Sequence, residues 1–318
     1  MLLYLAPMEE VTGYIFRNTI EKHFGGIDRY YTPFICPNQN KILKTRDGRE
    51  IIPEHNAGLD VIPQILTNNA EHLVELVTFL YELGYNEINL NCGCPSGTVV
   101  KKKRGSGLLD DTELLDELLD GYYSSDIASK VKMSVKTRVG YDTEEDFVEV
   151  IKIYNKYPLT ELIIHPRIQK DLYQGQIRMN MFEYGTVNAN MPVCYNGDIF
   201  TAKHYTELMD NNEFIGDVKA VMIGRGAVAN PGLFREIKNG RKMTIDELIS
   251  FHDDLFETYA SEYSEKDALF KLKEVWAYMQ KDFDGIEKSL KNMKKSQNRA
   301  EYLAACREIW RGEYLLDG

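Results

Sequence analysis

The sequence contains no apolar run of ~18 residues or more, the length that a membrane-spanning helix requires. Its first ten residues, 1–10, also lack the basic start and the full apolar stretch of a secretory signal. Hydrophobic residues nevertheless make up 43% of the 318 positions. We therefore expect a cytoplasmic protein with a large core and no membrane contact.

Cysteine is scarce, and the odd, sparse set does not suit a disulfide framework, so we expect reduced thiols. Two of the thiols are only one residue apart, but no further ligands stand near them at the spacing of a metal site, so we expect no metal. The five cysteines are Cys36, Cys92, Cys94, Cys194 and Cys306.

Positive charge is in deficit, because 38 Lys and Arg residues face 49 Asp and Glu residues and leave a net charge of −11. This balance argues against a protein that coats nucleic acid non-specifically. It does not exclude a local basic track, since phosphate binding depends on where the cations lie.

Proline and strand patterns are both absent after Gly240. Thr244, followed by Asp246 and Glu247, is typical of a helix start, where a capping side chain precedes acidic residues. We therefore predict a small helical domain at residues 241–318 and a catalytic domain at residues 1–240.

Before that point, short apolar runs alternate with helical patterns, which is typical of repeated βα units. Eight such units within 240 residues predict a (β/α)8 TIM barrel, with a doubly wound sheet as the structural alternative. The eight predicted strands are Leu2–Ala6, Arg29–Ile35, Val61–Leu66, Glu87–Asn91, Lys132–Thr137, Glu161–His165, Val193–Tyr195 and Ala220–Ile223.

Polar residues follow or end most of these runs, and barrel enzymes carry their chemistry at the carboxyl ends of the strands. After the seventh and eighth strands, Asn196-Gly197-Asp198 and Gly224-Arg225-Gly226 predict a phosphate site, because glycines let backbone N–H groups approach and arginine adds a charged fork. The alternative for the last cluster is a tight turn.

Two side chains point to chemistry at this end. Lys136 lies on the fifth strand, and a buried lysine needs an anionic partner, either a barrel carboxylate or a ligand such as the reduced edge of a flavin. Cys94 lies between Gly93 and Pro95 on the loop after the fourth strand, and a thiol still carries its proton at neutral pH. The alternative is a buried structural cysteine, which is the role we expect for Cys92.

Two basic segments are candidates for an extended anionic partner. One follows Cys94, and the other lies on a C-terminal helix where spacings of three and four place several cations on one face. The alternative for both is an ordinary solvated surface. The segments are Lys101, Lys102, Lys103 and Arg104, and Lys288, Lys291, Lys294, Lys295 and Arg299.

Seven motifs in order along the whole chain resemble those of the tRNA-dihydrouridine synthases, in the bacterial branch. The segment Lys271–Tyr278 also loosely resembles the basic, aromatic stretch of that family's helical domain. The motifs are Ala6-Pro7-Met8 with Thr12 and Arg17; Pro63-Gln64; Asn89-Leu90-Asn91-Cys92-Gly93-Cys94-Pro95; Lys136-Thr137-Arg138; His165 with Arg167; Tyr195-Asn196-Gly197-Asp198; and Met222-Ile223-Gly224-Arg225-Gly226-Ala227.

The resemblance implies FMN as cofactor, NADPH as reductant, and reduction of the carbon 5–carbon 6 double bond of uridines in tRNA by a monomer. Cys94 would be the proton donor. FMN would contact Pro7, Met8, Glu9, Gln64, Lys136, His165, Asn196, Gly197, Asp198, Gly224 and Arg225. The substrate would contact Asn91, Arg138 and Arg167, and the basic run Lys101, Lys102, Lys103 and Arg104.

The chain departs from the family pattern at Pro166, where a glycine is usual, and at Ser96-Gly97-Thr98. Two other functions stay open at this point. One is an FMN-dependent dehydrogenase of the dihydroorotate or dihydropyrimidine type, against which the basic helical appendage argues. The other is a non-catalytic RNA-binding relative, against which the combination of Cys94, Lys136 and the phosphate loop argues.

Overall fold

The computed structural model describes residues 1–37, 43, 45–212, 215 and 218–314. The chain divides into two compact units. The first comprises residues 1–7, 28–197 and 212–222, and the second comprises residues 8–27, 198–211 and 223–318. This division does not follow the predicted boundary at residue 240, and the assignment of catalytic and tRNA-binding domains stays a prediction.

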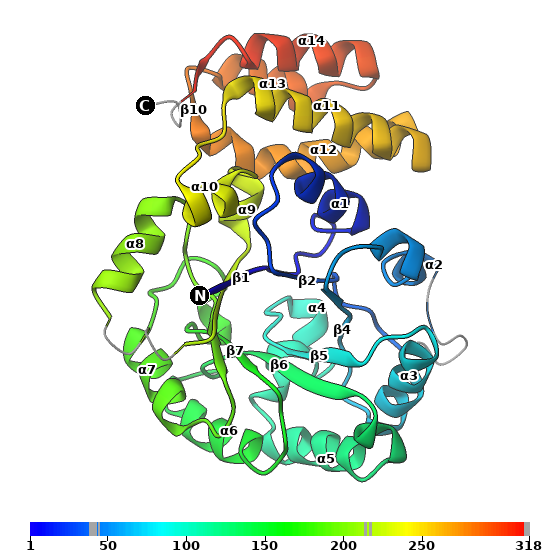
Figure 1. Cartoon of the computed structure of the whole chain (residues 1–318), viewed down its shortest axis with the longest axis vertical. Coiled ribbons are helices and arrows are strands. Elements are labelled where there is room, and N and C mark those ends of the chain that lie inside the picture. The colour runs from blue at the N-terminus through cyan, green and yellow to red at the C-terminus, as the bar shows by residue number, and fades with distance from the viewer. Residues whose placement is uncertain (38–42, 44, 213–214, 216–217, 315–318) are drawn as a thin grey trace. The chain divides into compact units, whose positions relative to one another are not determined.

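The first unit is built on one sheet whose strands follow the order β3-β2-β1-β9-β8-β7-β6-β5-β4. Figure 1 labels most of these strands. The two outermost strands in this order, β3 (Val61–Ile62) and β4 (Gln64–Ile65), are separated only by Pro63, so the sheet closes on itself. Proline lacks the N–H that a strand ladder needs, which explains the interruption. The other strands are β1 (Leu2–Leu5), β2 (Arg29–Tyr31), β5 (Glu87–Cys92), β6 (Lys132–Arg138), β7 (Leu162–His165), β8 (Val193–Tyr195) and β9 (Ala220–Ile223).

Helices alternate with these strands along the chain, so the predicted (β/α)8 barrel is confirmed and the doubly wound alternative is wrong. The helices are α1 (Tyr14–His23), α2 (Thr45–Arg49), α3 (Ala70–Glu82), α4 (Gly97–Val100), α5 (Thr112–Tyr123), α6 (Asp146–Tyr154), α7 (Met179–Asn188), α8 (Ala202–Asp210), α9 (Arg225–Ala229) and α10 (Leu233–Asn239). Short 3₁₀ helices are η1 (Pro53–Asn56), η2 (Gly105–Leu108), η3 (Asp126–Ser129), η4 (Gln169–Asp171) and η6 (Gln280–Asp282).

The helix α3 illustrates how local sequence sets these elements. The Asn69 side chain accepts a hydrogen bond from the backbone N–H of His72 and so caps the first turn. Leu73 and Leu76 are buried on one face. Gly84 follows the helix at φ +96°, a left-handed conformation that glycine adopts without steric cost.

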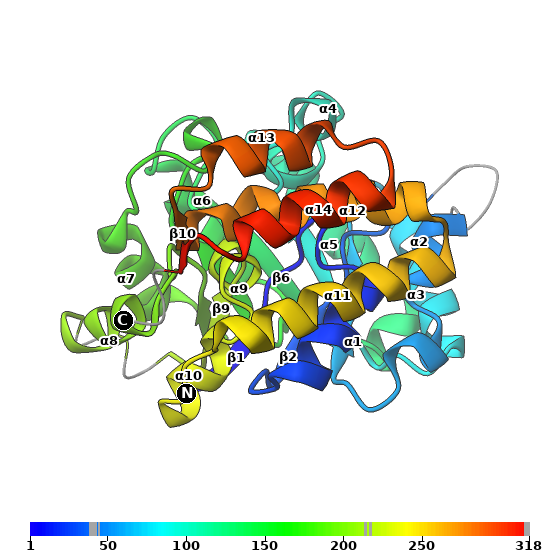
Figure 2. The same cartoon turned by 90° about the horizontal axis from the view of Figure 1, so that it is seen from above.

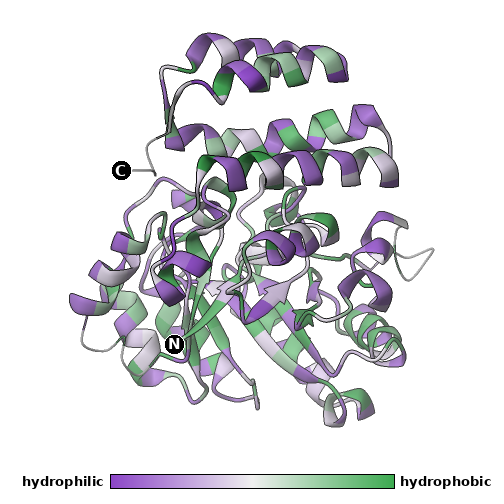
Figure 3. Cartoon of the chain, turned by 45° about the horizontal axis from the view of Figure 1, so that its top comes forward, coloured by the Kyte–Doolittle hydropathy of each residue, from purple (hydrophilic) through white to green (hydrophobic). Residues whose placement is uncertain are grey.

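The strands themselves are almost entirely buried, as parallel strands covered on both faces should be. Figure 3 shows their hydrophobic colouring. Inside the barrel, a cluster of buried side chains includes Tyr4, Tyr31 and Ile163. In the described part of the chain, no helix is long and apolar enough to cross a membrane.

The second unit contains α1 and the four C-terminal helices α11 (Ile245–Glu262), α12 (Glu265–Met279), α13 (Glu287–Lys295) and α14 (Arg299–Ile309). Within it, α11 packs against α12 and α1, and α13 packs against α14 (Figure 2). The predicted start of α11 is confirmed, because Thr244 and Glu247 form a reciprocal capping box.

One expectation for this region was wrong. We predicted no strand after residue 240, but β10 (Phe283–Asp284) pairs antiparallel with β11 (Glu313–Tyr314). Each strand has only two residues, which is too short for an alternating pattern to be visible in the sequence.

Candidate active site

The barrel places several predicted site residues side by side at the carboxyl ends of its strands. In the strand register, Asn91 of β5 lies opposite Lys136 of β6. Two residues further along β6, Arg138 lies opposite His165 of β7. Parallel pairing therefore brings together residues that are far apart in the sequence.

A chain of hydrogen bonds between buried polar side chains links β4, β5 and β6. Asn91 Nδ2 donates to Gln64 Oε1 at 2.8 Å, and Gln64 Nε2 donates to Asn89 Oδ1 at 2.8 Å. Asn89 Nδ2 then donates to Ser134 Oγ at 3.0 Å. Sequence reasoning assigned no role to Asn89 or Ser134, and the sequence shows no signal for them beyond the motif that contains Asn89. The amides of Gln64 and Asn91 are thus held in fixed orientations.

The loop that carries Cys94 is held by this amide chain. The backbone N–H groups of Gly93 and Cys94 both donate to Asn91 Oδ1, at 3.0 and 2.9 Å. On the far side, the Cys94 carbonyl accepts hydrogen bonds from the backbone N–H and the hydroxyl of Ser106. Cys94 itself is half-buried, and its sulfur is not part of a disulfide. Asn91 therefore positions the loop of the predicted proton donor.

Gly105 is a further residue to which sequence reasoning assigned no role. It adopts φ +57°, and a Cβ atom there would lie 2.8 Å from the Cys94 carbonyl oxygen. Only glycine allows the two segments to approach so closely. The chain directly after the basic run Lys101–Arg104 therefore packs against the backbone of Cys94.

The neighbouring Cys92 differs from Cys94 in its burial. It is fully buried, and this burial raises the pKa of its thiol to about 12. The structure therefore gives Cys92 the environment of a packing residue, as expected. All five cysteines lie in the described part of the chain and are free thiols.

Lys136 is the half-buried cation of this site. Burial, together with the nearby charge of Arg138, lowers the pKa of Lys136 to about 8. No hydrogen bond or ion pair of its ammonium group is found among the described residues. Of the two partners considered for this lysine, a barrel carboxylate is therefore not seen, whereas a bound anionic group would fit.

His165 and Arg167 form the next part of the site. Arg167 Nη1 lies 3.2 Å from His165 Nε2, and Arg167 Nε donates to the Gly175 carbonyl at 2.6 Å. Because a guanidinium can only donate, His165 Nε2 accepts and the proton of the neutral ring lies on Nδ1. Both residues are buried.

The sequence interpretation also placed Arg138 against the substrate. In the structure this side chain is 1% exposed. Its three nitrogen atoms each donate to a backbone carbonyl, those of Gly93, Ile168 and Leu172. Because these hydrogen bonds occupy all three nitrogen atoms, Arg138 is better suited to positioning the loops than to contacting a substrate directly.

After β8, Asn196 and Gly197 lie where they were expected. Asn196 Nδ2 donates to the Met222 carbonyl at 2.8 Å, which ties the end of β8 to β9. A Cβ atom at Gly197 would lie 2.0 Å from the Tyr195 hydroxyl. The position therefore requires glycine.

The predicted residues Met8 and Glu9 belong to the second unit, and Pro7 is the last residue of the first segment of the barrel unit. The Met8 N–H donates to Thr12 Oγ1 at 2.8 Å, and Arg17 Nη1 donates to the Thr12 carbonyl at 3.0 Å. These bonds explain why Thr12 and Arg17 accompany the first motif: they fold the turn after Met8 into one conformation.

The second unit also holds Asp198, Gly224 and Arg225. Arg225 forms an ion pair with Asp198, and its guanidinium carbon lies 5.4 Å from the centre of the Phe200 ring. The Lys281 ammonium lies 5.3 Å from the same ring. Two cations therefore lie close to one aromatic ring, an arrangement that could attract an anion.

Two of the four basic side chains in the run after Cys94 have partners among the described residues, and two do not. Lys103 forms an ion pair with Asp111 at 2.6 Å, and Arg104 Nε donates to Asn68 Oδ1 at 3.2 Å. Lys101 and Lys102 are exposed, and no partner of their side chains is found among the described residues. Two of the four cations therefore remain available to a polyanion.

The C-terminal basic segment shows a similar division. Lys288, Lys291 and Lys295 are exposed on α13. Arg299, by contrast, pairs with Glu257 and with Glu265 in the same unit. Sequence spacing could not predict these acidic partners, because they lie on other helices.

A protein-family model described as dihydrouridine synthase (Dus) matches residues 4–311 of this chain. The chain belongs to the dihydrouridine synthase family. It is accordingly an enzyme, an oxidoreductase, as the motifs predicted.

Two relatives match over nearly their full length, and a third matches over about two thirds. The chain is 28% identical to the tRNA-dihydrouridine(16) synthase of Escherichia coli (strain K12), covering 97% of this chain and 98% of the relative. The protein of the same name from Shigella flexneri is also 28% identical, with the same coverage. The tRNA-dihydrouridine synthase B of Pasteurella multocida is 25% identical over 74% of this chain and 69% of its own length.

Solved structures share the fold at low sequence identity. Histamine dehydrogenase from Rhizobium sp. 4-9 matches with a TM-score of 0.54 and 11% identity, covering 75% of this chain and 46% of that one. Morphinone reductase matches with a TM-score of 0.52 and 10% identity, covering 76% and 87%. At these identities the similarities concern the fold alone.

Proposed function

We propose that this enzyme reduces the carbon 5–carbon 6 double bond of uridines in tRNA, with FMN as cofactor and NADPH as reductant. The observation that carries the proposal is a half-buried thiol, Cys94, on a rigid loop beside Lys136 at the carboxyl ends of the barrel strands. The printed names of the relatives, which specify tRNA and dihydrouridine, support the same substrate.

The residues of the barrel fit a flavin. A cation whose pKa is lowered to about 8 by burial, and for which no partner is found in the described residues, suits the electron-rich edge of a reduced ring. The residues of the barrel unit that would hold the cofactor are Pro7, Gln64, Lys136, His165, Asn196 and Gly197. FMN, when bound, supplies the hydride for carbon 6 of the uracil.

Cys94 acts as the general acid that donates a proton to carbon 5 of the uracil. Hydride addition leaves negative charge on the uracil ring, and this charge is quenched when a protonated donor reaches the neighbouring carbon. The Lys136 ammonium and the Nδ1–H of His165 are positive or donating groups that stabilise the developing charge on a ring oxygen. Asn91 keeps the Cys94 loop in place while this happens.

The second unit would contribute two functions. Arg225, with Asp198 and Gly224, would hold the cofactor phosphate, and Met8 and Glu9 would line the cofactor. The exposed lysines of α13 would contact the tRNA backbone, and the basic run Lys101–Arg104 of the first unit would do the same. Arg167, which also belongs to the first unit, would contact the uracil or the cofactor edge.

Two measurements test this proposal. The purified protein should be yellow, and heating should release FMN as identified by chromatography. The reduced enzyme, mixed once without oxygen with tRNA that lacks dihydrouridine, should be reoxidised and should leave a mass gain of two hydrogen atoms on a uridine. Position 16 is the first uridine to examine, because two of the relatives carry it in their names.

Other outcomes would select other functions. Reoxidation by free orotate or uracil but not by tRNA would indicate a small-molecule dehydrogenase. A colourless protein that binds tRNA without changing it would indicate a non-catalytic relative. Either result would overturn the proposed function.

A further inference from the structure

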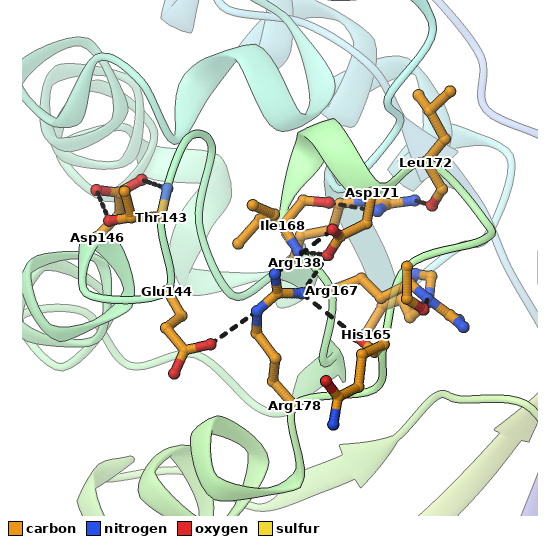
Figure 4. Close-up of polar contacts among 12 residues, drawn as sticks. Arg138, Thr143, Glu144, Asp146, His165, Arg167, Ile168, Asp171, Leu172 and Arg178 are labelled. Carbon is orange, nitrogen blue, oxygen red and sulfur yellow. Dashed lines mark hydrogen bonds and ion pairs between the residues drawn. The ribbon is translucent and has the colours of Figure 1, made fainter.

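The loop between β7 and α7, residues 166–178, is held at several points along its length. Asp171 accepts a hydrogen bond from the Ile168 N–H at 3.0 Å and forms an ion pair with Arg178. Arg178 also pairs with Glu144 at 2.7 Å (Figure 4). The tip of the loop nevertheless exposes about half of each of two large side chains, Leu172 and Tyr173.

One buried side chain joins this loop to the loop of Cys94. Arg138 Nη1 donates to the Ile168 carbonyl at 2.8 Å, and Nη2 donates to the Leu172 carbonyl at 2.6 Å (Figure 4). Its Nε donates to the Gly93 carbonyl at 2.9 Å, directly before Cys94. The guanidinium carbon also lies 5.5 Å from the centre of the Tyr173 ring.

These contacts use the geometry that distinguishes arginine from lysine. The guanidinium presents donors in several fixed directions in one plane, so it can join three carbonyl groups from two chain segments. Burial lowers the pKa of Arg138 to about 10, and no carboxylate ion pair of this side chain is found among the described residues. A cation held in this way, at 1% exposure, offers almost no surface to a phosphate group.

We propose that Arg138 is a positioning residue that fixes the Cys94 loop and the 166–178 loop relative to each other, and that it does not contact the substrate. The proposal rests on the proposed function only in taking Cys94 as the reacting thiol. A weaker link between the same two loops runs parallel to it, from Gln169 Nε2 to the Pro95 carbonyl at 3.4 Å. Leu172 takes a left-handed backbone conformation, φ +51°, at the carbonyl that Arg138 holds, so removal of the guanidinium frees a segment that is already strained.

The test measures both loops without measuring activity. In Arg138→Gln, the rate of Cys94 alkylation by iodoacetamide should rise roughly tenfold, the factor that corresponds to ~1.4 kcal/mol of easier local opening. Chymotryptic cleavage after Leu172 or Tyr173 should accelerate together with it. Peptide mapping separates Cys94 from Cys36, the other partly exposed thiol, which serves as an internal reference.

Arg178→Gln is the matched control, because Arg178 braces the same loop through Asp171 and Glu144, and neither of these partners belongs to the Cys94 segment. This variant should accelerate cleavage in the loop but leave Cys94 alkylation at the wild-type rate. Reoxidation of the reduced enzyme by tRNA should slow in Arg138→Gln, while the tRNA dissociation constant and its salt dependence should stay unchanged.

Arg138→Lys keeps the charge but cannot join three carbonyls, so it should resemble the glutamine variant in alkylation and cleavage. It also replaces the glutamine variant if that protein does not fold. Wild-type alkylation and cleavage in both variants, or in the lysine variant alone, would overturn the positioning role. Weaker tRNA binding with a smaller salt slope at unchanged alkylation would instead assign Arg138 to the substrate. Neither result depends on whether Cys94 is the proton donor, so failure of the proposed function would be seen separately.

Discussion

At the amino ends of the barrel strands, Arg29 forms ion pairs with Asp60 at 2.8 Å and with Glu87 at 3.0 Å. At the carboxyl ends, the ammonium of Lys136 has no such partner among the described residues, and Arg138 donates only to uncharged carbonyl groups. Arg29 at the amino end therefore has carboxylate partners, whereas Lys136 and Arg138 near the carboxyl end have none among the described residues.

Acidic groups follow the same division. Glu161, just before β7, is buried and accepts hydrogen bonds from the hydroxyls of Tyr4 at 3.2 Å and Tyr31 at 3.4 Å. Lys219 lies 3.9 Å from the same carboxylate. No comparable carboxylate contacts Lys136 in the described part of the chain. At the amino end, Arg29 and Glu161 thus have charged partners, whereas Lys136 near the carboxyl end has none among the described residues and is suited to an anionic ligand.

This difference in charge pairing indicates that residues at the amino ends of the strands stabilise the barrel, whereas residues at the carboxyl ends are arranged to bind a ligand. Satisfied buried groups stabilise a fold, while a buried cation without a counter-ion destabilises it until an anionic ligand arrives. Substitutions at the two ends should therefore have opposite signatures, and each of the following predictions tests one side of that contrast.

The largest effect should follow from Cys94→Ala at the carboxyl end. Loss of a positioned general acid slows the step that needs it by about 10²–10⁴-fold. Reoxidation of the reduced enzyme by tRNA should slow by that factor in a single turnover, while FMN content, reduction by NADPH and thermal stability should stay near wild type.

Cys92→Ala is the control for this variant, because Cys92 is fully buried and its thiol has a raised pKa. It should reduce stability and leave the reoxidation rate largely unchanged. A slow Cys92 variant beside a fast Cys94 variant would reverse the assignment of the proton donor.

At the amino end, Glu161→Ala should produce the opposite signature. Two buried tyrosine hydroxyls would lose a charged acceptor, and such a hydrogen bond contributes about 1.5–3 kcal/mol. The free energy of unfolding in urea should fall by roughly that amount for each of the two bonds lost, while turnover at saturating substrate should not change.

Glu161→Gln sharpens this test, since it keeps an oxygen acceptor and removes the charge. Burial raises the pKa of Glu161, so the folded state disfavours the carboxylate. Wild-type stability should accordingly decline as the pH rises from the ordinary glutamate pKa through the raised one. The glutamine variant should lack that decline, and an unchanged pH profile would contradict the role of the buried charge.

Lys136→Met should stabilise the cofactor-free protein while impairing function. The lowered pKa means that the folded state disfavours the ammonium, so wild-type stability should rise between pH 8 and the ordinary lysine value of 10.5. Removing the charge should raise the free energy of unfolding at pH 7 by about 1–3 kcal/mol and abolish that rise. FMN affinity, measured by flavin fluorescence, should fall in the same variant, and a destabilised variant would mean that Lys136 has a counter-ion.

The sequence predicted the barrel well because its strands are buried on both faces and read as short apolar runs. The end of β2 was placed too late, at Ile35, because strand pairing stops at Tyr31 and resumes only as a bridge between Ile35 and Ile65. The sequence shows Pro63, but it does not show that the sheet closes between the two strands on either side of this proline. The strands β10 and β11 were too short to leave a pattern.

The sequence indicated which residues lie together at the carboxyl ends of the strands, but not which contacts they make. Asn91, Lys136 and His165 lie at or near the carboxyl ends of β5, β6 and β7, where barrel geometry gathers side chains from different strands. Pairing depends on the folded loops instead. Of the three carbonyls that Arg138 holds, two lie 30 and 34 residues further along the chain and one lies 45 residues before it. Asp111 neutralises Lys103 from a helix cap, so neither constraint could be derived from spacing.

The smallest effect concerns the exposed lysines of the carboxyl end. Lys101 and Lys102 lie on the Cys94 loop, and the described residues include no partner for their side chains, whereas Lys132 is an equally exposed lysine at the first position of β6, at the amino end. If tRNA approaches the carboxyl end, removing one phosphate-binding cation there should lower the slope of log affinity against log salt by about 0.7–0.9. Lys101→Gln and Lys102→Gln should each show this change, and Lys132→Gln should show none. Lys103→Gln should have a smaller effect, because Asp111 already neutralises that charge. Equal slopes in the Lys101, Lys102 and Lys132 variants would mean that these cations belong to an ordinary solvated surface and that the contrast between the two ends does not extend to the substrate.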